Sequence, residues 1–285
     1  MHTVERAVEQ VIDSIHENYG EELCIDDLAR TAMYSKFHFT RIFQRVTGLT
    51  PGRFLSAVRL QKAKQLLTAT PRTVTDISHM VGYTSVGTFS SRFAYSVGVP
   101  PRTYRRLGGR RPWTSFQNRR GDGGQRAARP RTAVRGTVSV TDAACTGPIF
   151  VGLFPGKIPE GEPVRCAILR RPGPYVLDDV PPGTWYAMAC CPQGPQAPQN
   201  GQGRPGNRGF GRFNPFDGRI RVPRDDNMVV CHYGPITVHP GVVRIADIEL
   251  RPMCSFDPPV LLALPDMRPE ALVHEAGYAE AGLAA

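Results

Sequence analysis

The stretch Val74–Arg106, VTDISHMVGYTSVGTFSSRFAYSVGVPPRTYRR, decides the fold of the first third of this chain. Its first part predicts a short helix, because Ile77 and Val81 lie one helical turn apart and Gly82 follows them as a terminator. A second helix and a proline stop come next. Two short helices joined by a tight turn are the pattern of a helix-turn-helix unit.

The second helix of this unit has one apolar side and one side that is available to a partner. It begins after Thr84 or Ser85, either of which can cap its N-terminus. The apolar stripe consists of Phe89, Phe93 and Val97. The other side presents Val86, Gly87, Ser90, Ser91 and Arg92. In a helix-turn-helix unit, this side of the second helix reads the partner molecule.

The same pattern occurs about fifty residues earlier, so the chain contains an internal repeat. The earlier copy is IDDLARTAMYSKFHFTRIFQRVTGLTP, residues 25–51. Its matching positions are Ile25, Leu28, Ala32, Tyr34, Phe39, Phe43, Gly48 and Pro51. In the later copy, which has one inserted residue, these correspond to Val74, Ile77, Val81, Tyr83, Phe89, Phe93, Gly98 and Pro101.

A single helix is predicted between the two copies. Pro51 is suited to a helix start, and the segment FLSAVRLQKAKQLLTA follows it. Its apolar side contains Phe54, Leu55, Val58, Leu66 and Leu67. Arg59, Lys62 and Lys64 lie elsewhere on the helix, and we expect Lys62 to contact DNA phosphate, independently of sequence. The sequence therefore predicts two reading units joined by one continuous helix.

On these motifs, residues 4–106 resemble the DNA-binding domain of the AraC/XylS family of bacterial transcription regulators. The most specific pieces are SKFHFTRIFQRVTGLTP, RLQKAKQLL and the ordered run from DISHMVGY through FSSRF to GVPPRTYRR. The resemblance implies an all-α domain of seven helices at residues 1–107. Its two helix-turn-helix units would enter successive stretches of the major groove of double-stranded DNA.

The resemblance also implies which side chains contact DNA. In the first reading helix they are Lys36, Phe37, Thr40, Arg41 and Gln44. In the second they are Val86, Gly87, Thr88, Ser90 and Ser91. The family often has arginine where this chain has Ser91, and its own arginine, Arg92, comes one residue later. One residue turns a side chain by about 100° around a helix, so we expect Arg92 at a phosphate and Arg41 at a base edge.

The distribution of charge supports a polyanionic partner. Residues 1–107 contain 14 Lys and Arg against 9 Asp and Glu, residues 108–131 contain 7 against 1, and the remainder contains 14 against 15. The net charge of +10 therefore lies on the helical part and on the segment after it. We interpret the basic residues 108–131 as a flexible linker whose arginines either follow the DNA backbone or form a solvated tether.

From about Thr132 onward, short apolar or alternating runs replace the helical pattern. These runs are TVSV, PIFVGLFP, VRCAILRR, YVLDDV, TWYAMACC, MVVCHYG, ITVH and VVRIADIEL. With Pro, Gly and Asp between them, they predict about seven strands of an all-β sandwich at residues 132–252. YVLDDVPPGTWYAMA resembles a turn of the transthyretin-like, carboxypeptidase-regulatory sandwich. Residues 193–218 read as a disordered insertion and residues 253–285 as a tail.

The resemblance implies further partners, namely RNA polymerase, a small-molecule effector and a second copy of this chain. The sequence does not distinguish activation from repression. No run of about 20 apolar residues and no charged leader occurs, so we expect a cytoplasmic protein without membrane insertion.

No recognisable motif supports catalysis, a cofactor or a metal, so we expect a regulator and not an enzyme. Cys190 and Cys191 are neighbours, and in a strand one of them would be buried while the other could react. Two alternatives therefore stay open beside the regulator. One is a sequence-tolerant, architectural DNA-binding protein. The other is a sensor or repair protein that uses a reactive thiol at Cys191 or Cys231.

Overall fold

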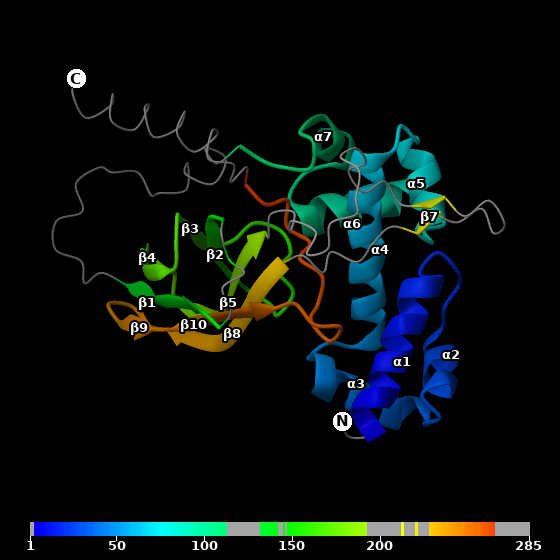
Figure 1. Ribbon diagram of the computed structural model, residues 1–285, viewed down its shortest axis with the longest axis horizontal. Helices are drawn as coiled ribbons and strands as arrows, with labels where there is room; N and C mark the ends of the chain where they lie inside the picture. The colour runs from blue at the N-terminus through cyan, green and yellow to red at the C-terminus, as the bar shows by residue number, and fades with distance from the viewer. Residues whose placement is uncertain are drawn as a thin grey trace, which may run out of the picture.

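The computed structural model describes residues 3–112, 132–141, 145, 147–192, 212–213, 220–221 and 228–265. Helices come first, followed by strands (Figure 1). The helices are α1 (Thr3–Asn18), α2 (Ile25–Thr31), α3 (Lys36–Thr47), α4 (Pro51–Ala69), α5 (Val74–Met80), α6 (Val86–Val97) and α7 (Pro101–Arg106). The strands are β1 (Ala133–Val140), β2 (Ile149–Phe154), β3 (Arg165–Leu169), β4 (Gly173–Asp178), β5 (Gly183–Pro192), β6 (Arg212–Phe213), β7 (Ile220–Arg221), β8 (Met228–Val238), β9 (Val243–Ile245) and β10 (Ile248–Pro252).

The internal repeat is a repeat of structure. Helices α3 and α6 both end at a glycine in the left-handed region, Gly48 with φ 75° and Gly98 with φ 86°. This conformation is accessible to glycine without steric cost and turns the chain sharply out of the helix. A proline then begins the next helix in both copies, α4 and α7.

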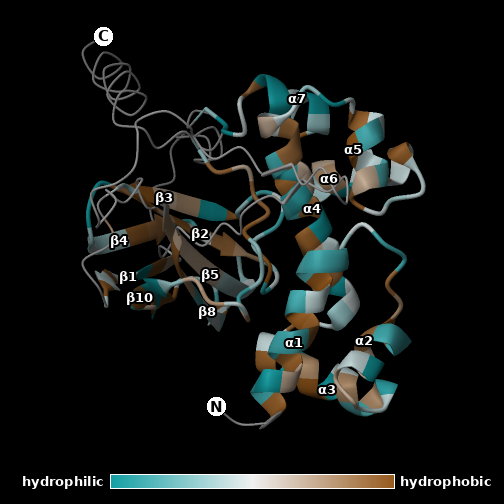
Figure 2. Ribbon diagram, turned by 45° about the vertical axis from the view of Figure 1, so that its right-hand side comes forward, coloured by the Kyte–Doolittle hydropathy of each residue, from teal (hydrophilic) through white to brown (hydrophobic). Residues whose placement is uncertain are grey.

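Aromatic rings form the centre of each copy. In the first, the ring of Phe43 lies 5.6 Å from Phe39 and 5.5 Å from Phe54. In the second, the ring of Phe93 lies 5.6 Å from both Phe89 and Tyr104. These tilted and edge-on ring pairs add attraction beyond the burial of apolar area. Figure 2 shows teal and brown residues alternating along the helices, as the amphipathic pattern predicts.

Eight of the strands form one sheet that folds over on itself, and β6 pairs with β7 in a separate two-stranded sheet. The order of the larger sheet is β3-β2-β5-β8-β10-β1-β4, with β9 also pairing with β1. The two ends of this path are joined by residues 170–172, so the sheet encloses its own core. The core contains buried side chains from strands along the whole sheet. They include Val134 on β1, Val151 on β2, Leu177 on β4, Val229 on β8 and Leu250 on β10. The predicted all-α domain followed by a β-sandwich is thus confirmed.

Two of the expected strand boundaries are wrong. The sequence predicts MVVCHYG and ITVH as two strands separated at Gly234 and Pro235. They form the single strand β8, because a bulge at these two residues lets the strand continue. Tyr233 pairs with Ala187, whereas Ile236 pairs with Trp185. Proline has no N–H for the ladder, and a bulge is where a strand can accommodate it.

In contrast, VVRIADIEL is divided into β9 and β10. The carboxylate of Asp247 accepts a hydrogen bond from the Thr137 N–H at 2.8 Å and so takes the place of a backbone partner. Gly136 lies opposite this division. A Cβ at this glycine would lie 2.0 Å from the carbonyl oxygen of Ala246, so only glycine fits there.

An extended segment, residues 259–264, joins the helical part to the sandwich. Its side chains alternate: Val260 and Leu262 pack on the outer face of the sheet, whereas Leu261 and Ala263 pack on the helical core. Alternation with period two is the geometry of an extended chain. In Figure 1 this orange segment passes between the sheet and α4.

The predicted linker, insertion and tail fall largely outside the described residues. This applies to Trp113 and Phe116, to most of residues 193–218 and to residues 266–285. Among the described residues, no helix has both the length and the hydropathy that a membrane span needs.

Candidate nucleic-acid interface

Helix α3 carries the first set of predicted contacts. Phe39, Ile42 and Phe43 are buried, which turns the opposite side of the helix outward. The sequence-predicted side chains Lys36, Phe37, Arg41 and Gln44 are exposed and Thr40 is half-buried. Phe37 is 83% exposed, an unusual state for a large apolar ring and one that suits contact with an apolar partner surface.

Two of these side chains make local contacts in the free chain. Lys36 Nζ lies 3.0 Å from Asp26 Oδ2 in an exposed ion pair with α2. The Thr40 hydroxyl donates a hydrogen bond to the Lys36 carbonyl at 2.8 Å. An exposed pair of this kind contributes little stability, so Lys36 is available to a phosphate.

Helix α6 presents the second set at an open groove. The groove is lined by Arg53, Gly87, Thr88, Ser91, Arg92, Tyr95 and Glu160. Ser91 and Arg92 therefore border the same groove, although the arginine of this chain comes one residue later than the arginine that the family often has at position 91. Val86 and Ser90 are half-buried and do not line the groove.

Three groove residues were not predicted from the sequence. Arg53 lies in the first turn of α4, Tyr95 is 66% exposed on α6, and Glu160 belongs to the link between β2 and β3. The order of the chain gave no signal for Glu160, which reaches the groove only because the sandwich packs on the helical part.

Arg59 and Lys62 of α4 do not face outward as expected. The guanidinium of Arg59 donates to the carbonyls of Tyr19 and Glu21, both at 2.8 Å. Lys62 is only 5% exposed and lies over the Tyr19 ring. Because α4 is enclosed by α1 and the sandwich, the predicted phosphate contact of Lys62 is wrong.

Lys64 instead fastens the extended segment to α4. Its ammonium group donates to the carbonyl of Val260 at 2.8 Å and to that of Leu262 at 3.3 Å. The Ala263 N–H donates to the Val97 carbonyl at 3.0 Å. The sandwich is thereby held to the linking helix and to the end of α6.

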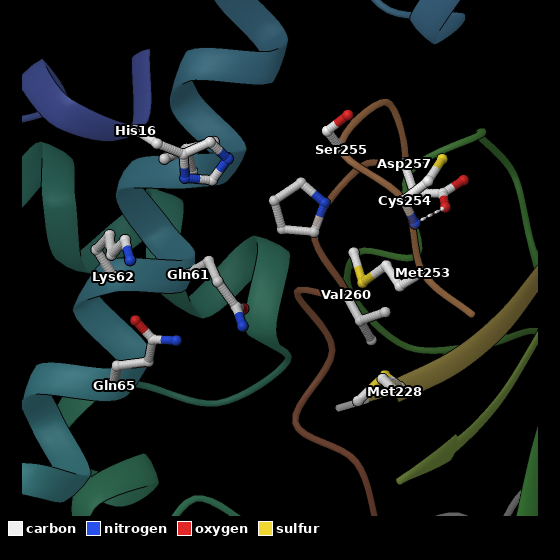
Figure 3. A pocket seen from close by; sticks show the side chains of 12 residues that line it. His16, Gln61, Lys62, Gln65, Met228, Met253, Cys254, Ser255, Asp257 and Val260 are labelled. Carbon is white, nitrogen blue, oxygen red and sulfur yellow. Dashed lines mark hydrogen bonds between the residues drawn. The ribbon is translucent and has the colours of Figure 1, made fainter. Parts of the chain in front are cut away.

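A small cavity lies between α4 and the sandwich (Figure 3). His16, Gln61, Lys62 and Gln65 face Met228, Met253, Asp257 and Val260 across it. Its volume of about 60 Å³ holds a few water molecules, whereas a cavity that binds benzene is more than twice as large. A larger guest would have to displace the flexible methionine side chains.

Cys190, Cys191 and Cys231, the cysteines singled out from the sequence, lack the surroundings of a reactive thiol. Cys190 and Cys191 are both fully buried, contrary to expectation, because β5 is covered on both faces. Burial raises the pKa of Cys190 to about 12 and also raises the pKa of Cys231. A raised pKa depletes the reactive thiolate, which argues against a cysteine-based sensor or repair protein. No cluster of three or more metal-binding side chains occurs among the described residues.

Comparison with known proteins places the helical part in a defined group. The family model described as a helix-turn-helix domain matches residues 28–107. The transposon Tn10 TetD protein of Escherichia coli is 36% identical over 99 residues, which cover 35% of this chain and 72% of TetD. The melibiose operon regulatory protein of Escherichia coli is 35% identical over 107 residues, which cover 38% of this chain and 35% of that protein. The chain thus spans about a third of the length of the melibiose protein.

A solved structure of similar sequence covers the same part. It is that of a probable AraC family transcriptional regulator from Rhodopseudomonas palustris, at 31% identity and a TM-score of 0.34. The match covers 36% of this chain and 97% of that structure.

Proposed function

This chain belongs to the AraC/XylS family of helix-turn-helix transcriptional regulators, and we propose that it reads double-stranded DNA with both α3 and α6. The observation that carries this proposal is the structural repeat. Two helix-turn-helix units with matched aromatic cores expose the outer sides of their second helices. An exposed second helix is the element that enters the major groove in such units.

The linking helix sets the spacing of the two reading helices. A helix of 19 residues, the length of α4, spans about 28 Å. One turn of B-DNA is about 34 Å, so bent DNA or weaker engagement by α6 would reconcile the two lengths. We assign base reading chiefly to Arg41 and Thr40 of α3, and backbone positioning to Lys36 and Arg92.

The remainder of the chain is proposed to regulate this reader. We divide the chain into the reader at 1–107, a basic linker at 108–131, the sandwich at 132–252 and a tail at 253–285. The sandwich would sense an effector or join two copies of the chain. The sandwich is attached to α4 where Lys64 donates to the carbonyls of Val260 and Leu262, and this supports such a role. Movement of the sandwich would shift α4, the helix that sets the spacing of the two reading helices. RNA polymerase is the further partner expected of a transcriptional regulator.

Selection from random duplex DNA with the full chain tests the proposal. The expected result is a motif with two blocks about one helical turn apart. Titration of the selected and a scrambled duplex at two salt concentrations then separates specific from general binding. A steep salt dependence without sequence preference would instead support the architectural alternative.

A further inference from the structure

The link between β2 and β3, residues 155–164, docks on the helical domain beside the second reading helix. Glu160 provides the central contacts. One of its carboxylate oxygens lies 2.8 Å from Arg53 Nη2, and the other accepts a hydrogen bond from the Ser96 hydroxyl at 3.0 Å. The next residue, Gly161, donates its N–H to the Ser96 carbonyl at 2.6 Å.

The link reaches the end of each reading helix. A Cβ at Gly48, where α3 ends, would lie 3.1 Å from the Lys157 ammonium nitrogen. A Cβ at Gly98, where α6 ends, would lie 3.0 Å from a guanidinium nitrogen of Arg111. Arg111 in turn pairs with Glu162 at 3.1 Å. The link is therefore fitted against both helix-turn-helix units.

The position of Glu160 conflicts with an approaching phosphate backbone. Its carboxylate borders the groove that Gly87, Thr88 and Ser91 line on α6. A negative charge at this place repels phosphate, and it also forms an ion pair with Arg53, one of the two arginines that line the groove.

The Arg53–Glu160 pair is open to solvent on the arginine side. The side chain of Arg53 is 50% exposed, whereas that of Glu160 is 16% exposed. A polyanion that offers several phosphates can replace one carboxylate at Arg53.

We propose that the Glu160 link is an autoinhibitory contact, in which the sandwich places the Glu160 carboxylate at the groove of the second reading helix and DNA must displace it. This inference rests on the proposed function, because it assumes that α6 faces DNA. In the free chain α3 remains open, so DNA engages α3 first and α6 only after Glu160 and Gly161 have moved from Arg53 and Ser96, while Ile158 stays buried in the helical core. A signal that loosens the sandwich would then raise DNA affinity without altering either reading helix.

The first test measures the affinity of the full chain for the duplex that it selects from random DNA. Glu160→Gln removes the charge and keeps the size of the side chain, so affinity at low salt should rise about two- to fivefold. The matched control is Asp178→Asn, which makes the same charge change at an exposed position on β4 and should leave affinity unchanged. High salt should reduce the gain. Equal affinities of wild type and Glu160→Gln would overturn the inference.

The second test needs no variant. Amide hydrogen exchange reports whether the Gly161 N–H stays bonded to Ser96. Saturating selected duplex should accelerate exchange at Gly161 while the amides within α4 remain protected. Unchanged protection of Gly161 on saturated DNA would show that the contact persists, which refutes autoinhibition but leaves DNA reading intact. Failure of the chain to select any duplex would reject the proposed function itself.

Discussion

At the scale of single residues, Arg41 combines the features of a base-reading side chain. It projects from the exposed side of α3, whose buried side is fixed by Phe39 and Phe43. Its planar guanidinium can donate two parallel hydrogen bonds to a guanine edge, and this fixed fork is more selective than the flexible ammonium group of lysine.

Arg41→Ala should therefore lower the preference for the selected duplex over random DNA by about 1–3 kcal/mol. Competitive titration of the two duplexes measures this preference. Arg41→Lys is the control, because it keeps the charge and should retain general affinity while losing discrimination. Equal losses on both duplexes for Arg41→Ala would assign Arg41 to phosphate contact instead.

The thiols differ sharply in access. Cys24 is exposed before α2, whereas Cys190 and Cys191 are fully buried. In the folded chain we expect a maleimide to label Cys24 readily and the buried pair only after unfolding, because burial both shields these thiols and, for Cys190, raises the pKa to about 12. Peptide mapping with Cys24→Ser as control checks this. Rapid native labelling of Cys191 or Cys231 would restore the reactive-thiol alternative.

At the scale of elements, the first helix of each unit begins with a reciprocal cap. The Thr73 hydroxyl donates to Asp76 Oδ2 at 2.7 Å and accepts from the Asp76 N–H at 3.0 Å. Asp27 accepts from the Cys24 N–H at 3.1 Å in the earlier copy. The hydrogen bond from the Thr73 side chain is the main reason why the pKa of Asp76 lies below its usual value.

This lowered pKa gives the cap a defined pH dependence. A carboxyl group with a depressed folded-state pKa stabilises the fold above its unfolded pKa of about 4, and this contribution is lost as pH falls through the folded value. Asp76→Asn should thus lower Tm near neutral pH, and the difference from wild type should shrink below about pH 4. Thermal unfolding across pH measures both. Thr73→Ser keeps the hydroxyl and should keep the wild-type profile, whereas a pH-independent difference for Asp76→Asn would argue against the linkage.

At the scale of the whole molecule, the extended segment 259–264 couples the two folded parts. Lys64 is its principal polar attachment to α4. Lys64→Met keeps the apolar stem and removes both hydrogen bonds, so local opening of the segment should become easier by about 2 kcal/mol.

Amide exchange at Ala263, whose N–H is bonded to Val97, reports this opening. Arg102→Met is the control, because it removes a cation from an exposed position on α7. If Ala263 exchanges equally in wild type and Lys64→Met, apolar packing alone holds the segment.

Local pattern was sufficient to predict the two helix-turn-helix units and the helix that links them, whereas the number of seven helices followed from the family resemblance. Period, caps and helix breakers act within a few residues, so they leave a direct trace in the sequence. Phe39 and Phe89 could be paired across the repeat for this reason, whereas Arg41 was assigned to the outer side of the first reading helix by the family resemblance.

Tertiary structure alone decided what covers each side chain. Lys62 and Lys64 have the composition of a basic face, yet one is buried and the other binds backbone carbonyls about 200 residues away in sequence. Cys191 is buried because a second layer covers β5, and Glu160 meets α6 because the sandwich docks there. Such contacts depend on how separate elements pack, and packing between distant segments has no local period from which it could be predicted.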